Sequence, residues 1–90
     1  MSASVELTPL GFAIRVDDET DEGSHLISGG ESNGVLIFHA RHRANEYADA
    51  WNDHSHYFAR HGYAGAEWDL RQACKDLSRT HGRIYAQQEA

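Results

Sequence analysis

The longest periodic stretch of the chain is residues 44–61, where apolar residues recur every three or four positions. This spacing is typical of an amphipathic helix, because each helical residue turns about 100°. Arg60 and His61 suit a helix C-terminus, and Gly62 can adopt the left-handed conformation that ends a helix. We expect the helix to begin within 41–46. Its predicted buried stripe is Ala44, Tyr47, Ala48, Trp51, Ser55, Phe58 and Ala59.

Apolar residues that alternate with polar or small ones predict strands before this helix. Residues 10–17 alternate strictly and should bury one face. Residues 24–32 form a weaker strand, and residues 1–9 a short edge element that Pro9 interrupts. The predicted buried face of the 10–17 strand is Leu10, Phe12, Ile14 and Val16.

A turn at Asn33-Gly34 is the strongest hairpin signal in the chain, because a type I′ turn needs two positive φ angles. Residues 35–40 would then return as the third strand, with Gly30 facing Ile37. The alternative is a six-residue loop, 29–34, between shorter strands. Both alternatives predict a three-stranded antiparallel meander.

A second helix is predicted over residues 66–81 after a short connection, which favours an antiparallel arrangement of the two helices. It either ends at Gly82 or continues to about residue 87, since Ile84 and Tyr85 extend its stripe. We therefore predict an α+β fold of order βββαα, a three-stranded antiparallel meander followed by two antiparallel helices. The predicted stripe of this helix is Ala66, Leu70, Ala73, Cys74 and Leu77.

The predicted core lies where the sheet meets the two helices. Burial of one aromatic or leucine side chain contributes roughly 1.5 to 3 kcal/mol, so Trp51 should be important to a small core. The sheet residues expected in this core are Phe12, Ile14, Leu36 and Phe38, and the helix residues are Trp51, Phe58, Leu70 and Leu77.

Composition indicates one small domain with a thin core. The chain has 90 residues, of which 40% are hydrophobic, against a usual share of about 45 to 50%. We expect a single domain over 1–90, with an acidic sheet part at 1–40 and a helical part at 41–90. A thin core favours a homodimer or a complex with a partner that supplies further burial.

The net charge of −6 belongs entirely to the N-terminal part. Residues 1–40 carry one basic residue, Arg15, against seven acidic ones, whereas residues 41–90 carry seven of each sign. Direct nucleic-acid binding needs a basic patch, and none is visible in the sequence. The acidic part favours a partner protein with a basic surface, or serves solubility alone.

Cys74 is the chain's one cysteine, so no intrachain disulfide forms and no oxidising compartment is indicated. The N-terminus lacks the pattern of a signal peptide, and the longest apolar run, 35–38, is far shorter than a membrane span of about 20 residues. We expect a soluble cytoplasmic protein that does not bind membranes.

The seven histidines do not form a recognisable metal site. His54 and His56 would point about 200° apart on a helix, and His54 and His61 lie two turns apart. We interpret the histidines as surface residues, with a histidine-rich metal-binding domain as an alternative. They predict a response to pH between about 5 and 8.

No catalytic or cofactor motif is present, so we expect a protein that is not an enzyme and binds no cofactor. Cys74 lies on a predicted buried stripe and should be a core residue. The carboxylates in residues 17–22 lie in a predicted loop, where mobility would spoil the positioning that acid–base catalysis needs.

Two groups of residues are candidates for partner binding. An acidic loop could dock on basic side chains of a protein that handles nucleic acid, or could only keep the chain soluble. Trp68 lies off its helix's stripe beside Arg71, a composition typical of interface hot spots, unless it folds back onto the first helix. Tyr57 could extend that surface. The loop carboxylates are Asp17, Asp18, Glu19, Asp21 and Glu22.

We therefore hypothesise a small, acidic, non-enzymatic inhibitor or adaptor that binds another protein and blocks a nucleic-acid-handling complex by steric and electrostatic occlusion. In its general profile it resembles phage or mobile-element counter-defence proteins such as anti-CRISPR inhibitors. That resemblance rests on size, acidity and the lack of a catalytic set. The alternative is a homodimeric structural or regulatory module without a foreign target.

Overall fold

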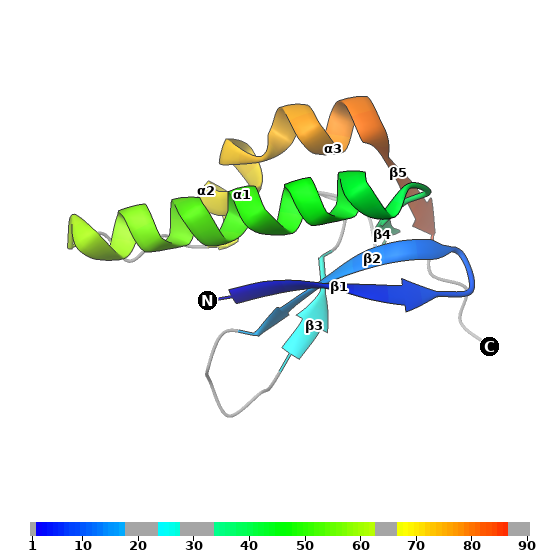
Figure 1. Cartoon of the computed structure of the whole chain (residues 1–90), viewed down its shortest axis with the longest axis horizontal. Helices are drawn as coiled ribbons and strands as arrows, with labels where there is room; N and C mark the ends of the chain where they lie inside the picture. The colour runs from blue at the N-terminus through cyan, green and yellow to red at the C-terminus, as the bar shows by residue number, and fades with distance from the viewer. Residues whose placement is uncertain (1, 18–23, 28–33, 63–66, 87–90) are drawn as a thin grey trace.

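The computed structural model describes residues 2–17, 24–27, 34–62 and 67–86, and contains an antiparallel sheet with helices on one face (Figure 1). The strand order is β1-β2-β4-β5, and β3 pairs with β2 off this path. The elements are β1 (Ser2–Thr8), β2 (Gly11–Asp17), β3 (Ser24–Leu26), β4 (Gly34–Phe38), α1 (Arg41–Arg60), α2 (Glu67–Ala73), α3 (Lys75–His81) and β5 (Gly82–Ala86).

β1 and β2 form a hairpin with a tight turn at Pro9 and Leu10. Thr8 pairs with Gly11 across the turn, so β1 is a complete strand and Pro9 follows it without interrupting it. The Thr8 hydroxyl donates to the Gly11 carbonyl at 2.9 Å and accepts from the Leu10 amide at 3.2 Å. These two bonds hold the turn in place and explain why a strand can end beside this proline.

Gly11 is required by both conformation and space. Its φ of 142° is one that other residues rarely adopt. A Cβ there would lie 2.7 Å from Ile37 Cγ2 and 2.9 Å from the Phe38 carbonyl oxygen. The glycine therefore lets β2 approach β4 closely.

The predicted hairpin at Asn33-Gly34 is wrong. β3 and β4 are both antiparallel to β2, so they run in the same direction and cannot form a hairpin together. β3 pairs with the second half of β2, and β4 with the first half. The Ile27 amide donates to the Ile14 carbonyl at 2.9 Å, and the Leu36 amide donates to the Ile27 carbonyl at 3.0 Å, where the two segments meet.

The reason is the composition of β4, in which all five residues are buried. Val35 and Ile37 point to one face of the sheet, and Leu36 and Phe38 to the other. A strand that is apolar on both faces is stable in the centre of a sheet and not at its edge. β4 accordingly pairs with β2 on one side and with β5 on the other.

β5 lies in the part of the chain that we predicted to be helical, so the βββαα order is wrong. The helix ends at His81, and Gly82 continues in extended conformation with φ −101° and ψ 165°. A Cβ on Gly82 would lie 2.7 Å from Leu36 Cδ1, so the missing side chain lets β5 pair with β4. Ile84 and Tyr85, which we interpreted as a helical stripe, suit a strand because they are β-branched and aromatic.

The second predicted helix is interrupted at Cys74, which separates α2 from α3. Cys74 has φ −98° and ψ 9°, outside the helical range. Leu70 and Cys74 are buried and Leu77 is half-buried, as the stripe predicted, whereas Ala73 is exposed. Ala66 lies outside the described residues.

α1 confirms the helix on which the sequence prediction depended. It spans 20 residues and ends at Arg60, with His61 as its C-cap and Gly62 at a φ of 69°. Its buried residues are Ala44, Tyr47, Ala48 and Trp51. Ser55 and Phe58 are half-buried and Ala59 is exposed, because the last turns extend beyond the sheet.

The main core lies between α1 and the sheet. Five of the eight predicted core residues are buried in it, and the other three, Phe12, Phe58 and Leu77, are half-buried and pack against it. Tyr47 lies between Phe38 and Trp51, with ring centroids 5.5 Å and 6.2 Å away. A smaller cluster of Ala13, Val35 and Ile37 occupies the opposite face of the sheet. Within the described ranges, no helix is both long and apolar enough to cross a bilayer.

Asn52 of α1 binds the outer edge of β1. Its Oδ1 accepts from the Ala3 amide at 2.7 Å, and its Nδ2 donates to the Ala3 carbonyl at 3.0 Å. The carboxamide thus makes the pair of bonds that a neighbouring strand would make. This contact fixes α1 against the edge strand and satisfies backbone groups that would otherwise be open to pairing.

Replacement of Trp51 should nearly unfold the domain. Trp51→Ala removes a side chain with 0% exposure and should cost about 3 to 5 kcal/mol, a large part of a small domain's stability. Trp51→Phe is the control. It should cost clearly less, because it retains most of the contacts and removes a buried Nε1 that has no hydrogen-bond partner in the described structure. Urea denaturation measures both, and a wild-type midpoint for Trp51→Ala would contradict this core.

Loss of the Asn52 contact should destabilise the domain without opening its core. Asn52→Ala removes two hydrogen bonds to Ala3 and should lower the free energy of unfolding by about 1 to 2 kcal/mol. The matched control is Asn45→Ala, an exposed position on the same helix, where we expect a change within about 0.5 kcal/mol. Equal stabilities of the two variants in urea would show that the contact contributes nothing.

Candidate functional site

Tyr57 is the predicted site residue that the structure places most clearly at the surface. It lies in the last turns of α1 and is 56% exposed. Its ring packs on His61 with centroids 4.4 Å apart, and contacts Phe58 edge-on at 6.1 Å. The neighbouring rings restrict the tyrosine, which lowers the entropy that a partner would have to overcome on binding.

A cavity of about 500 Å³ adjoins Tyr57 on α1. Asp53 and Arg60 bring opposite charges to it, and the lining residues that the structure describes all belong to α1. We call this region the Tyr57 surface and define it by the lining residues Asn52, Asp53, His56, Tyr57 and Arg60. An aromatic residue with polar neighbours is suited to protein recognition.

The structure describes only part of the remaining predicted site. Asp17 is exposed at the end of β2. Arg71 is half-buried in the last turn of α2 and does not line the Tyr57 cavity. Trp68 belongs to α2, and its side chain lies outside the described part. The four further loop carboxylates also lie outside the described residues: Asp18, Glu19, Asp21 and Glu22.

Asp17 and the Tyr57 surface lie toward the same end of the molecule (Figure 1). Asp17 pairs with Ser2, the next residue of β1 is Ala3, and Ala3 is bound to Asn52 of the Tyr57 surface. This series of contacts connects the end of β2 to Asn52, which lies five residues before Tyr57 on α1. The sequence could not predict this connection, because it depends on the hydrogen bonds between Asn52 and β1.

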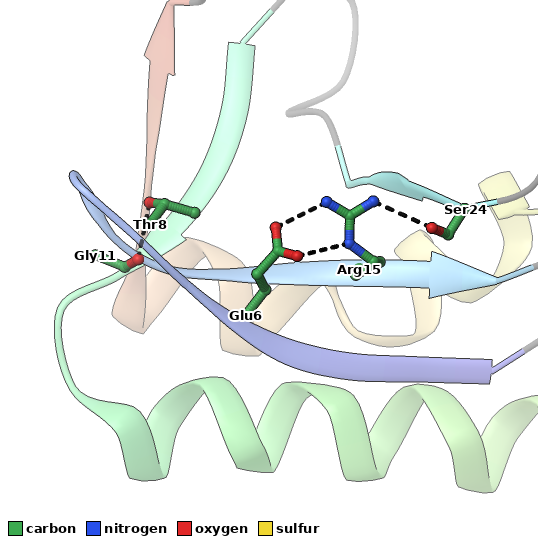
Figure 2. Close-up of polar contacts among 5 residues, drawn as sticks. All are labelled: Glu6, Thr8, Gly11, Arg15 and Ser24. Atoms are coloured by element: carbon green, nitrogen blue, oxygen red, sulfur yellow. Dashed lines mark hydrogen bonds and ion pairs between the residues drawn. The ribbon is translucent and has the colours of Figure 1, made fainter.

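The lone basic residue of the acidic part is engaged in a structural contact (Figure 2). Arg15 of β2 donates two hydrogen bonds of 2.8 Å to Glu6 of β1, and one of 3.1 Å to the Ser24 hydroxyl of β3. The guanidinium thus joins three strands. Its hydrogen bonds to Glu6 lower the pKa of that carboxyl, so the carboxylate stays charged to a lower pH than an unpaired glutamate would.

The histidines and the cysteine do not gather into a metal-binding group in the part of the chain described. No group of three or more His, Cys, Asp or Glu residues there could hold a metal ion. Cys74 is 1% exposed in the main core, and burial raises the pKa of its thiol to about 11. A thiol in that environment is a core residue and a poor nucleophile.

A second surface, which the sequence analysis missed, is strongly basic. A cavity of about 590 Å³ lies between the start of α1, the end of α3 and the start of β5. We call it the cationic cavity and define it by the three arginines and three histidines in its lining: Arg43, Arg79, Arg83, His39, His42 and His81. These residues are far apart in sequence. The predicted antiparallel arrangement of the two helices, however, already places the residues near 41 beside those near 81, and the basic cluster could have been predicted from this.

Comparison of the chain with protein-family models, with curated proteins and with solved structures found no match. The functional argument therefore depends on the geometry and charge of the described surfaces.

Cys74 should be unreactive while the protein is folded. A thiol with a pKa of about 11 is roughly 0.1% ionised at pH 8, against about a quarter for an ordinary cysteine. Iodoacetamide should therefore alkylate the native protein at least about 100-fold more slowly than the same protein in urea. Mass spectrometry of timed samples measures both rates, with glutathione as a reference thiol. Similar rates in the two conditions would show that the thiol is accessible.

Proposed function

We propose that the chain is a small, acidic, non-catalytic protein-binding domain that inhibits or adapts a protein that handles nucleic acid. The observation that supports this best is the exposed Tyr57 in the last turns of α1, the helix whose Asn52 binds Ala3 of β1, next to the residue that pairs with Asp17. The proposed mechanism is occlusion, in which the acidic segment covers a basic channel and Tyr57 anchors the contact.

The Tyr57 surface has the chemistry of a protein interface. Tyrosine is enriched at interface centres because it buries a large area at low entropic cost. Asp53, His56 and Arg60 can form a polar rim around the ring. Since the whole surface is carried by one helix, it should bind without rearrangement.

Charge supports the choice of a basic partner. The net charge is −6, and Arg15, the one basic residue of the acidic part, is already bonded to Glu6. Asp49 and Asp53 are exposed on α1 as well. A negative surface of this kind steers association with a positive one and disfavours direct contact with phosphate backbones. The proposal places this interaction in the cytoplasm and involves no cofactor.

A homodimeric module is the second candidate, because the β1–β2 turn exposes apolar side chains. Leu7 is 67% exposed and Leu10 51%, next to the edge strand β1. Two copies could bury these leucines against each other without any foreign partner.

Binding should depend on Tyr57 and on the acidic segment separately. The tagged wild-type protein should retain one stoichiometric nucleic-acid-handling protein from bacterial lysate, and the purified domain should block that protein's binding to nucleic acid. Tyr57→Ala should weaken the interaction about 10-fold or more, as expected for an interface hot spot. Lysine substitution of Asp17, Asp18, Asp21 and Glu22 together should abolish the inhibition.

The matched control is Leu10→Ala, which removes another exposed apolar side chain away from the Tyr57 surface and should leave the affinity within about twofold. Trp68→Ala tests the α2 residue in the same assay. Intact inhibition by the lysine variant would contradict the electrostatic part of the proposal. Recovery of the protein only as its own dimer in sedimentation, with Leu10→Ala as a monomer, would support the homodimeric module instead.

A further inference from the structure

The cationic cavity gathers positive side chains on an acidic protein. Three of the chain's eight lysine and arginine residues line it, together with three histidines. No acidic residue is among the lining residues that the structure describes. The arginines come from three different elements: Arg43 from α1, Arg79 from α3 and Arg83 from β5.

Two of these arginines are available to a ligand. Arg43 forms an ion pair with Glu46 at 3.1 Å. Arg79 and Arg83 are exposed and have no ion pair within the described structure. Both line the cavity and no acidic residue is among its described lining residues, so an anion bound there would be attracted to two arginines without competition from a carboxylate in the lining. Guanidinium groups suit phosphate in particular, because their N–H groups can donate two parallel hydrogen bonds to its oxygens.

The start of α1 adds to the same positive potential. Its N-cap is Ala40, a lining residue of the cavity, with no side-chain capping bond and no acidic residue in the first turn. Helices usually begin with an Asp, Asn, Ser or Thr cap and with acidic residues, which suit the positive end of the helix dipole. α1 has Arg41, His42 and Arg43 there instead. Its uncapped N–H groups supplement the donors that the arginines supply.

We propose that the cationic cavity binds a small molecule that carries a terminal phosphate or diphosphate group. Its volume of about 590 Å³ lies within the usual range of small-ligand pockets, roughly 300 to 1,000 Å³. Arg79 and Arg83 hold the phosphate oxygens, and the imidazole of His42 provides a further donor. Gly82, between the α3 and β5 arms of the site, is held opposite Phe38 by the pairing of β5 with β4.

This site is separate from the proposed protein interface. Arg43 and Tyr57 are 14 residues apart on α1, which corresponds to about 21 Å along a helix. The elements that carry the cavity residues, the start of α1, the end of α3 and the start of β5, lie together at one end of α1 in Figure 1, and the last turns of α1, which carry Tyr57, lie at its other end. Failure of one proposal therefore leaves the other unaffected.

The test is titration of the purified full chain with inorganic pyrophosphate, followed by ¹H–¹⁵N NMR and calorimetry at low salt. The wild type should show saturable binding with a dissociation constant of about 1 mM or lower, and shifts at residues 40–43 and 79–83. The double variant Arg79→Gln, Arg83→Gln should bind at least about 10-fold more weakly. The matched control is Arg60→Gln, which removes the same charge at the Tyr57 surface and should stay within about twofold.

Two further measurements decide the outcome. Thermal unfolding without ligand should be similar in the double variant and the control, so that a loss of binding reports the site and not the fold. A single-stranded oligothymidine of eight nucleotides tests phosphodiesters. If pyrophosphate displaces it and the double variant loses both, the site binds phosphate groups as proposed. Binding of the oligonucleotide alone, no saturable pyrophosphate binding, or equal affinity in the wild type and the double variant would overturn the proposal.

Discussion

The burial of β4 on both faces is the constraint on which the rest of the structure depends. Val35 and Ile37 need cover on one face and Leu36 and Phe38 on the other, while the backbone of the strand needs hydrogen-bond partners along both edges. β2 pairs with one edge of β4 over only two residue pairs. Farther along β2, the partner strand is β3 instead of β4. The other edge is left to β5, so the end of the chain must return to the sheet. α1 then covers the Leu36 and Phe38 face.

The return of the chain to β4 also produces the cationic cavity. β4 leads into α1 through His39 and Ala40, and β5 follows directly after α3. Because β4 and β5 are antiparallel with Phe38 opposite Gly82, the start of α1 and the end of α3 must lie together. Basic residues at those two ends are thereby placed around one space. A sheet interaction made for burial thus determines the position of a charged surface.

The sequence predicted the features that depend on local periodicity. The first part of the apolar stripe of α1, the end of the helix just before Gly62 and five of the eight core residues as fully buried were confirmed, because a helix stripe can be read without knowledge of its partners. Pairing between strands could not be read in this way. Asn33-Gly34 is a strong local turn signal, but the two-sided burial of Val35 to Phe38 was the stronger constraint and placed β4 beside β2. The same central position explains β5, since Ile84 and Tyr85 fit a helix stripe and a strand equally well by pattern.

The sum of charges over residues 41–90 did not reveal the cationic cavity. Residues 41–90 are neutral in sum, which suggested that no basic patch exists. In the fold the positive and negative charges of this half are separated in space. Arg43, Arg79 and Arg83 line the cavity, whereas Asp49 and Asp53 are exposed along α1. α1 therefore begins at a basic region and carries exposed acidic residues farther along its length. Asn52 maintains this arrangement by fixing the helix to β1, so the two charged surfaces are held a set distance apart by the same helix that closes the core.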